Sequence, residues 1–339
     1  MKYPFVSIIL LGYNSEKDIK ECIDSLKKQT YNNFEIIFVD NNSNDDSVKF
    51  IKQNYPNVKL ILNKKNYGFS KGNNIGIKNS KGDYIVILNT DTILDKLWLK
   101  NLVKAAKETD YDILQSKILF FDNKRINTIG NLIHYLGYSF CGGYGKVDYE
   151  INSNVKEITS ASGCCMLIKI PIFDRVGFLD EKMFMYYEDT DFSWRARLMG
   201  SKIGLVPNSI VYHKYKFSKN KNKFYFLERN RLISILKNYS LKSLLLISPA
   251  LILNEVGLFF YLIKEMVLHK KIASYFSILV NFNKIMNDRR YIQKNRVIND
   301  KELLKYFNQN FEFGEINGSF QKIFNLVFRK YGDLVGGLI

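Results

Sequence analysis

Three carboxylates, Glu188, Asp189 and Asp191, fall within four positions of the chain. They follow an aromatic and apolar run and precede a short helical pattern that ends at Gly200. Asp191 is well placed to cap that helix, because its side chain can accept from the first backbone N–H groups, and Arg195 could pair with it on the same face. Glu188 and Asp189 are then left just before the helix. A carboxylate held there can act as an acid or a base, unless all three simply form a solvated turn.

Polar residues also follow two apolar runs near the N-terminus. The runs at 5–11 and 34–39, with a helical pattern between them, predict two buried parallel strands joined by a helix. Ligands of such sheets bind beyond the carboxyl ends of the strands. Tyr13, Asn14 and Asp40 fall at these ends, so they are candidate ligand contacts. The alternative for Asp40 is a helix cap.

The segment 66–76 is rich in glycine and asparagine. Its spacing matches neither GxGxxG nor the P-loop pattern, so neither a dinucleotide site nor a P-loop is supported. Gly68 permits a tight turn with close approach of another backbone segment. We expect the helix that follows to aim its first N–H groups at a phosphate.

A candidate cation site follows the strand predicted at 84–88. Asn89 and Asp91 lie two residues apart at its end, so an amide and a carboxylate can project together. Oxygen ligands suit Mg²⁺ or Mn²⁺, which often keep several waters and bridge to phosphates. A turn with an Asx cap is the alternative. His213 comes directly after a strand predicted at 209–212, a place where a lone histidine is more often structural.

The positive charge of the chain is concentrated in its last third. The 339 residues carry a net charge of +17, and residues 210–339, with 22 Lys or Arg and nine Asp or Glu, hold +13 of it. A basic segment suits anionic lipid or nucleic acid, although compositional bias toward Lys, Asn and Ile would also produce it. Four cysteines without CxxC spacing, and an N-terminus without a signal peptide, predict reduced thiols and a cytosolic location.

An apolar run at 244–263 is long enough to span a bilayer. Pro249, Asn254 and Glu255 would be costly in the middle of a span. Basic residues flank and follow the run: Lys264, His269, Lys270, Lys271, Lys284, Arg289, Arg290, Lys294 and Arg296. We therefore favour an in-plane or re-entrant helix on the cytoplasmic leaflet over a true span. A helix buried against the catalytic domain or a dimer partner is the alternative.

Five blocks, in this order, resemble the family 2 glycosyltransferases, and in particular their rhamnosyltransferase-like branch. The blocks are 6–14, 39–43, 66–74, 88–92 and 184–197. Together they cover about 1–215. The resemblance implies an α/β GT-A fold, with a Rossmann-like, mostly parallel central sheet and helices on both faces. Residues 1–105 would bind the nucleotide sugar, 106–215 would hold the acceptor and catalytic residues, and 216–339 would be a basic helical, membrane-associating extension.

The resemblance also implies roles for individual residues. Positions that match the family's donor contacts are Tyr13, Asn14, Asp40, Asn42, Gly68, Asn74 and Asn89. Asn89-Thr90-Asp91 occupies the place of the DxD motif, where a divalent cation (Mn²⁺ or Mg²⁺) bridges to the donor diphosphate. Because Asn replaces the first Asp, Asp91 would be the main ligand, and His213 matches a histidine that joins the metal in some members. Asp189 matches the catalytic base in the family's Glu-Asp pair, with Glu188 beside it.

This chemistry agrees with the carboxylates noted first. A sugar hydroxyl is a poor nucleophile at neutral pH, and a positioned carboxylate can take its proton as the new bond forms. A cation and basic groups stabilise the leaving diphosphate, and in-line attack inverts the anomeric centre. The alternative is a non-catalytic basic protein that binds membranes or nucleic acid on a degenerate GT-A fold. The intact Asp91 and Asp189 argue against it. A nucleotidyltransferase would need a glycine-rich signature after the first strand, which 12–15 lacks.

The expected partners follow from the same resemblance. They are a nucleotide-diphosphate sugar donor, a glycan acceptor that is polyprenyl-linked as in similar enzymes, and an anionic membrane surface. Nucleic acid is not expected, and a homodimer is left open. The expected location is the cytoplasmic face of the cell membrane.

Overall fold

The computed structural model describes residues 3–122, 124–215, 222–311 and 319–339, with the side chains of 319–324 outside this description. The chain divides into two compact units. Unit 1 is made of Met1–Asn131, Cys141–Ser193 and Ser201–Lys216, and unit 2 of Leu132–Phe140, Trp194–Gly200 and Phe217–Ile339. The assignment of 1–105 to the donor and 106–215 to the acceptor stays a prediction, since both ranges lie largely within unit 1.

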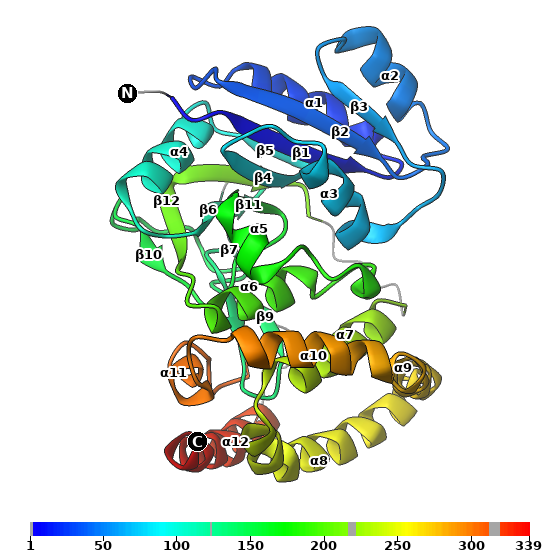
Figure 1. Cartoon of the computed structure of the whole chain (residues 1–339), viewed down its shortest axis with the longest axis vertical. Helices are drawn as coiled ribbons and strands as arrows, with labels where there is room; N and C mark the ends of the chain where they lie inside the picture. The colour runs from blue at the N-terminus through cyan, green and yellow to red at the C-terminus, as the bar shows by residue number, and fades with distance from the viewer. Residues whose placement is uncertain (1–2, 123, 216–221, 312–318) are drawn as a thin grey trace. The chain divides into compact units, whose positions relative to one another are not determined.

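Unit 1 is built on one twisted sheet (Figure 1). Its strands run in the order β10 (Lys156–Glu157), β12 (Ile203–His213), β6 (Ile113–Phe120), β11 (Cys165–Lys169), β4 (Tyr84–Asn89), β1 (Val6–Gly12), β2 (Phe34–Asp40), β3 (Lys59–Leu62). The strands β4, β1, β2 and β3 are parallel to one another, as are β6 and β12, and β11 is antiparallel to both neighbours. Two short strands pair at its edge, β5 (Thr92–Leu94) with β12 and β7 (Ile126–Thr128) with β6.

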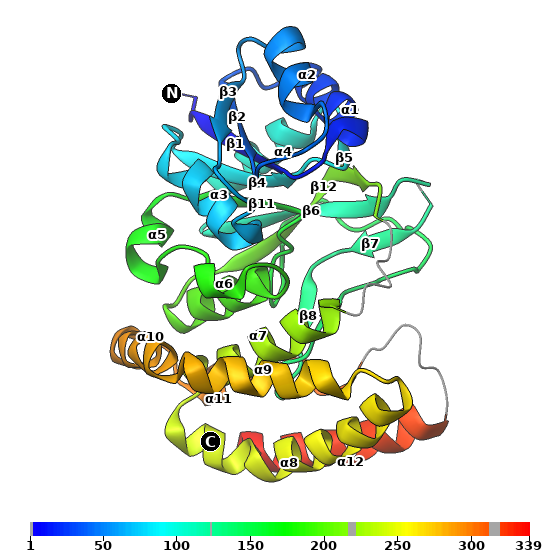
Figure 2. The same cartoon turned by 90° about the vertical axis from the view of Figure 1, so that its right-hand side faces the viewer.

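Helices cover both faces of this sheet, as predicted (Figure 2). The helices of unit 1 are α1 (Glu16–Lys27), α2 (Ser47–Asn54), α3 (Gly68–Lys78), α4 (Trp98–Glu108) and α5 (Pro171–Val176), with α6 (Glu188–Leu198) running on into unit 2. Side chains alternate along β1: Ile8 and Leu10 join the core with α1 and α4, whereas Ile9 faces α3. A Cβ at Gly76 would lie 2.5 Å from Ile9, so this glycine lets α3 approach the sheet closely.

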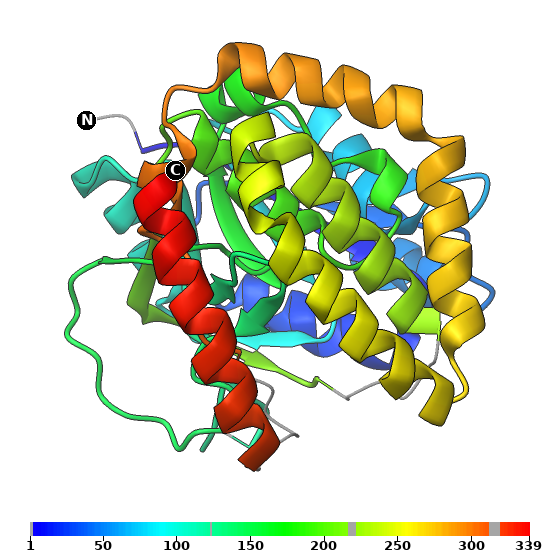
Figure 3. The same ribbon diagram turned by 90° about the horizontal axis from the view of Figure 1, so that it is seen from below.

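Unit 2 is helical over most of its length. Its helices are α7 (Asn222–Asn238), α8 (Leu241–Lys264), α9 (Leu268–Val280), α10 (Phe282–Asn295), α11 (Asp300–Leu304) and α12 (Ser319–Leu338). Within this unit α8 lies beside α9 and α12, as the view from below shows (Figure 3). Among the described residues α8 is the one helix long and apolar enough to cross a membrane by length and composition.

The region 122–157, which has no clear sequence pattern, contains more regular structure than its composition suggests. Besides β7 and β10 it holds β8 (Asn131–Ile133) and β9 (Ser139–Cys141), which pair with each other. These strands are only two or three residues long, too short to show the alternation that marks a strand in sequence. All four cysteines are free, and only Cys141 is exposed.

Candidate active site

The parallel register brings the first group of predicted residues to one edge of the sheet. Gly12 pairs with Asp40 across β1 and β2, and Leu11 pairs with Asn89 across β1 and β4. The carboxyl ends of three strands therefore stop side by side, and Asn14 follows the first of them. This is the edge where ligands of open parallel sheets bind.

Asp40 is a buried carboxylate with one oxygen engaged. Its Oδ2 accepts from the Ser43 N–H at 3.0 Å, which forms a tight turn after β2. Its Oδ1 is buried and, among the described residues, has no hydrogen-bond partner. Asn14 braces the same turn, because its Oδ1 accepts from the Asn44 N–H and its N–H donates to Ser43 Oγ, both at 2.9 Å. An orphaned acceptor in a pre-formed turn is ready for a donor group on a ligand.

Tyr13 and Asn42 flank this turn and are exposed. Asn14 and Asn42 both have positive φ, 53° and 64°. Asparagine tolerates this conformation better than most residues, so both loops can reverse direction sharply at the ends of their strands. Neither Tyr13 nor Asn42 has a polar partner within the described chain, and both are accessible to a ligand.

Asp91 and His213 are brought together, as predicted. The two residues flank the β5–β12 pair, and His213 Nε2 lies 3.2 Å from Asp91 Oδ1. On its other side His213 Nδ1 lies 3.1 Å from the Asn127 amide oxygen. Burial by itself would raise the pKa of Asp91, but the hydrogen bond and charge of His213, with the charge of Lys214, outweigh it and keep this pKa below its ordinary value.

This pair fits a divalent cation. If the Nδ1 proton of His213 is donated to Asn127, the lone pair on Nε2 faces a carboxylate, and a cation between the two would satisfy both. In the parts of the chain that the structure describes, no group of three or more His, Cys, Asp or Glu converges, here or elsewhere, so the protein supplies two such ligands at this site. Asn89, partly exposed at the end of β4, has an amide without a partner in the same described chain. A cation here would complete its shell with phosphate oxygens and water.

The start of α3 differs from the prediction. The N–H groups of Phe69 and Ser70 donate to the Phe184 carbonyl at 2.5 and 3.3 Å, and the Gly68 N–H donates to Asn66 Oδ1 at 2.8 Å. The prediction that these groups face a phosphate is therefore wrong, because the protein itself satisfies them. Asn41 holds Asn66 and the Gly68 carbonyl through its amide nitrogen, a bracing role that the sequence alone did not show.

Gly68 is required for another reason. Its φ is +79°, and a Cβ at this position would lie 2.4 Å from the Phe184 carbonyl oxygen. Asn74, another predicted donor contact, is buried, and its amide pairs with both backbone groups of Leu179. Because the Leu179 backbone occupies both polar atoms of the Asn74 side chain, Asn74 is better placed to hold the segment before α6 than to contact the donor.

The carboxylate pair sits inside the first turn of a helix. The prediction that Asp191 caps this helix is wrong, because α6 begins at Glu188 and the Asp191 N–H already donates to Tyr187. Phe184, Tyr186 and Tyr187 lead into the helix with φ of 62°, 64° and 75°. Non-glycine residues rarely adopt this conformation, and clusters of it are typical of functional sites.

Asp189 is held by backbone N–H groups. Gly163 donates to its Oδ2 at 2.8 Å, and Thr190 donates to its Oδ1 at 2.6 Å. Burial raises the pKa of Asp189, and these hydrogen bonds oppose the shift without cancelling it. A carboxylate that is fixed in place and made more basic suits proton abstraction.

Glu188 is the more deeply buried member of the pair. Its Oε2 has no partner among the described residues. Burial, with the charges of Asp189 and Asp191, raises the pKa of Glu188 well above its ordinary value. The pKa values of both carboxyl groups are therefore raised, and burial is the largest cause for each.

The small residues at 160–165 connect the two halves of the site. Cys164 accepts from the Asn89 N–H at 2.9 Å, and the preceding residue, Gly163, holds Asp189. Ala161 donates to Ser193 Oγ at 3.1 Å, which fastens the same loop to α6. The close packing of this segment thus positions the carboxylate.

The sequence model of glycosyl transferase family 2 matches residues 7–177, about half of the chain. The chain belongs to glycosyl transferase family 2. This match covers β1 to α5 and so includes the edge with Asp40, Asn89 and Asp91, while Asp189 and His213 lie beyond it. The predicted family and enzyme class are confirmed, whereas the rhamnosyltransferase-like branch stays a prediction.

Two curated relatives are similar to more than half of the chain. The low-salt glycan biosynthesis hexosyltransferase Agl10 of Haloferax volcanii is 30% identical over 207 residues, 59% of this chain and 64% of that protein. Glycosyltransferase GlyG of Streptococcus pneumoniae is 27% identical over 219 residues, 62% of this chain and 70% of that protein. The match thus spans a little under two thirds of the Haloferax relative.

Solved structures share the fold. S. aureus TarS 1-349 in complex with UDP is 22% identical with a TM-score of 0.52, over 69% of this chain and 66% of that chain. GalNAc-T7 with UDP, GalNAc and Mn²⁺ is 16% identical with a TM-score of 0.57, over 70% of this chain and 48% of that chain. The predicted GT-A architecture is confirmed.

Proposed function

We propose that this family 2 protein transfers a sugar from a nucleotide-diphosphate donor to a hydroxyl of a glycan acceptor, with inversion at the anomeric carbon. The observation that carries the proposal is the Asp189 carboxylate, clamped by backbone N–H groups and linked through Gly163 and Cys164 to Asn89. One short loop therefore holds both the base and the strand end assigned to the donor.

The donor is assigned to the edge formed by β1, β2 and β4. The orphaned Oδ1 of Asp40 can accept from an N–H of the base, and the exposed Tyr13 ring can stack on it. Asn14 and Asn42 shape the turns beside it, and Asn89 offers a free amide to the diphosphate. The UDP bound by TarS and by GalNAc-T7 supports a uridine donor as the first one to test.

Asp91 and His213 are assigned to a divalent cation, Mn²⁺ or Mg²⁺, which would neutralise charge on the leaving diphosphate. The opposed Nε2 and Oδ1 atoms support this assignment. The Mn²⁺ in GalNAc-T7 is consistent with it. With two protein ligands, the cation would be held jointly by the protein and the nucleotide, so each should strengthen binding of the other.

Asp189 is assigned the role of general base, taking the acceptor hydroxyl proton as oxygen attacks the anomeric carbon and the bond to the diphosphate breaks. Its raised pKa strengthens it for this step. Glu188 beside it is buried, and burial raises its pKa well above the ordinary value. A single displacement needs no second nucleophilic carboxylate, as in inverting glycosidases.

The acceptor is assigned to a lipid-linked, in particular polyprenyl-linked, glycan at the cytoplasmic face of the membrane. The uneven distribution of charge along the chain supports this assignment, since +13 of the net charge of +17 lies beyond residue 209. The similarity to Agl10, a glycan biosynthesis hexosyltransferase, agrees with it. Each basic side chain near an anionic surface contributes about 1 kcal/mol of binding free energy, so a few of them would hold the enzyme there.

The deciding experiment screens purified protein with Mn²⁺ against a panel of nucleotide sugars by thermal shift. The donor that stabilises it is then incubated with polyprenyl-linked glycan acceptors. NMR of the product should show an anomeric configuration opposite to that of the donor. Retention of configuration would contradict the single displacement. If no nucleotide binds but vesicles or RNA do, the protein is a non-catalytic member of the fold.

A further inference from the structure

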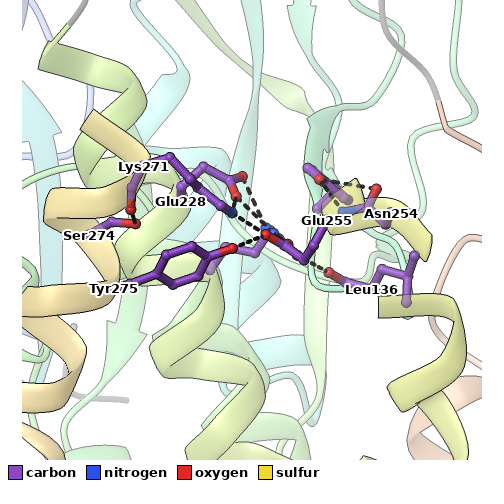
Figure 4. Close-up of polar contacts among 9 residues, drawn as sticks. Leu136, Glu228, Asn254, Glu255, Lys271, Ser274 and Tyr275 are labelled. Atoms are coloured by element: carbon purple, nitrogen blue, oxygen red, sulfur yellow. Dashed lines mark hydrogen bonds and ion pairs between the residues drawn. The ribbon is translucent and has the colours of Figure 1, made fainter. Parts of the chain in front are cut away.

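Unit 2 contains a buried cluster of four charged side chains, which we call the charge cluster: Glu228 and Arg231 of α7, Glu255 of α8, and Lys271 of α9 (Figure 4). Arg231 NH2 lies 2.8 Å from Glu228 and 2.7 Å from Glu255, and Lys271 Nζ lies 2.5 and 2.6 Å from the same two carboxylates. Two positive and two negative charges balance. The cluster therefore fastens three helices together from inside.

Uncharged polar groups complete the charge cluster. Tyr275 of α9 donates to Glu255, the Leu136 carbonyl accepts from Arg231 at 2.9 Å, and Asn254 of α8 hydrogen-bonds Tyr138. Burial by itself would raise the pKa of Glu228, but Arg231 and Lys271 lower it to about 2, so this carboxylate stays charged at neutral pH. The polar residues that would be costly in an apolar helix are thus satisfied within the protein.

The helix α8 differs from a surface helix of a soluble protein, because many of its apolar side chains point away from the protein. Its inward face carries the polar residues Ser243, Asn254 and Glu255 together with Ile247, Ala250 and Leu262, while Ile252, Val256 and Phe260 point outward. Phe260 is 67% exposed. Soluble surface helices bury the apolar stripe and expose the polar one.

The neighbouring helix α9 also turns apolar side chains outward. Lys271, Ser274 and Ile278 are buried, whereas Ile272 and Phe276, the latter 68% exposed, face outward. On α12, which packs beside α8, Leu334 is 58% exposed. Exposed large apolar side chains grouped on neighbouring helices are typical of an interaction site. We call the outward side chains of Ile252, Val256, Phe260, Ile272, Phe276 and Leu334 the apolar face of unit 2.

Exposed basic residues accompany this face. They are Lys242 and Lys264 at the ends of α8, His269 on α9, and Arg329 and Lys330 on α12. None of the four Lys and Arg side chains forms an ion pair within the described chain, and the exposed acidic residues of these helices are Glu265 and Asp333. An apolar face with a basic border fits the surface of an anionic bilayer, where apolar groups enter the acyl boundary and cations meet the headgroups.

We propose that the apolar face of unit 2 binds one leaflet of an anionic lipid bilayer, with α8 lying in the plane of that leaflet. A span would pull Glu255 away from Arg231 and Lys271 and leave charges unpaired in an apolar interior. The proposal gives a structural basis to the membrane location in the proposed function. It rests on unit 2 alone and not on the transfer chemistry.

Flotation of the full chain with sealed vesicles tests the binding. The protein should float with phosphatidylcholine vesicles that contain phosphatidylglycerol and float much less with pure phosphatidylcholine or at high salt. Phe260→Glu combined with Phe276→Glu should lower the bound fraction at least roughly tenfold, because two exposed aromatic side chains that would enter the bilayer are lost. Val147→Glu, an exposed apolar position in unit 1, is the matched control and should float like the wild type.

Thiol labelling tests the orientation. In a Cys141→Ser background, Lys242→Cys and Lys264→Cys place one thiol at each end of α8. Both should react with a membrane-impermeant maleimide added outside the vesicles. Protection of one end would show a span and overturn the proposal. Failure to float, with a stable dimer by light scattering, would assign the face to a second copy and overturn it too.

Nucleotide binding with Mn²⁺ is measured on every variant. Retained nucleotide binding without flotation would reject the membrane face and leave the transfer proposal standing. Flotation of a protein that binds no nucleotide would support the membrane face and reject the transfer proposal.

Discussion

The Gly163 N–H donates to Asp189 Oδ2 at 2.8 Å, so a backbone group in a loop of small residues sets the position of the assigned base. A Cβ at Gly163 would lie 3.5 Å from Asp189 Cβ and 3.3 Å from the Phe69 ring, which leaves little room for a larger residue. The next residue, Cys164, holds Asn89. The geometry of the base is thus coupled to the strand end assigned to the donor.

Replacing Asp189 with Asn should lower the transfer rate by roughly 10² or more, because the amide cannot take the proton. Nucleotide binding with Mn²⁺ should persist, since unit 1 keeps its donor edge. For the wild type, the raised pKa of Asp189 predicts that kcat falls as pH drops through that pKa, at a higher pH than for an ordinary Asp. Steady-state kinetics across pH measure both effects. Near wild-type turnover by the variant would sink the assignment.

Replacing Glu188 with Gln should cost less activity and should stabilise the fold. The raised pKa means that the folded state prefers protonated Glu188, so the wild type loses stability as pH rises from the unfolded pKa through the folded one. Gln mimics the protonated form and escapes this loss. We expect the variant to melt at least about 2 °C higher than the wild type at pH 8, which corresponds to roughly 1 kcal/mol in a protein of this size, and to match it at low pH.

Thermal melts from pH 4 to pH 8 check the Glu188 prediction, with Glu181→Gln as the exposed control. The control should show no pH-dependent gain. A Glu188 variant that is less stable than the wild type at pH 8 would mean that the carboxylate is paired in its charged form, contrary to its orphaned Oε2.

Replacing Asp91 with Ala should weaken nucleotide-diphosphate binding in the presence of Mn²⁺ by roughly tenfold or more and leave metal-free binding little changed. Isothermal titration calorimetry with and without Mn²⁺ measures the metal-assisted and the metal-free affinity separately. His213→Ala should act in the same direction, because its Nε2 faces Asp91 at 3.2 Å. An equal loss under both conditions would show that Asp91 is structural.

Replacing Gly68 with Ala should destabilise unit 1 by more than the same change at Gly145. Both glycines have positive φ, +79° and +72°, so both variants carry a conformational cost of about 1–2 kcal/mol. Only at Gly68 would the new Cβ meet a backbone atom, the Phe184 oxygen, whereas nothing lies within 4 Å at Gly145. Urea unfolding compares them. Equal losses would mean that the approach of Phe184 to α3 is not tight.

Local pattern in the sequence was sufficient for the main strands of unit 1 and for the family, but not for the short strands between 122 and 157 or for the start of α6. Apolar runs such as 5–11 and 34–39 predicted β1 and β2 because buried parallel strands are apolar on both faces. The order of the motif blocks identified family 2, and the parallel sheet explains why Asn14, Asp40 and Asn89 meet, since strands of one direction end at one edge. The polar interruptions of the apolar run also argued from sequence against a span.

Tertiary structure decided which polar groups are already satisfied, because hydrogen-bond partners far apart in the chain leave no local pattern. The first N–H groups of α3 looked available to a phosphate, but the Phe184 carbonyl, more than 100 residues away, occupies them. Asn74 is likewise taken by Leu179. The same holds for α8: its composition left several orientations open, and only the pairing of Glu255 with Arg231 and Lys271 shows which face turns inward.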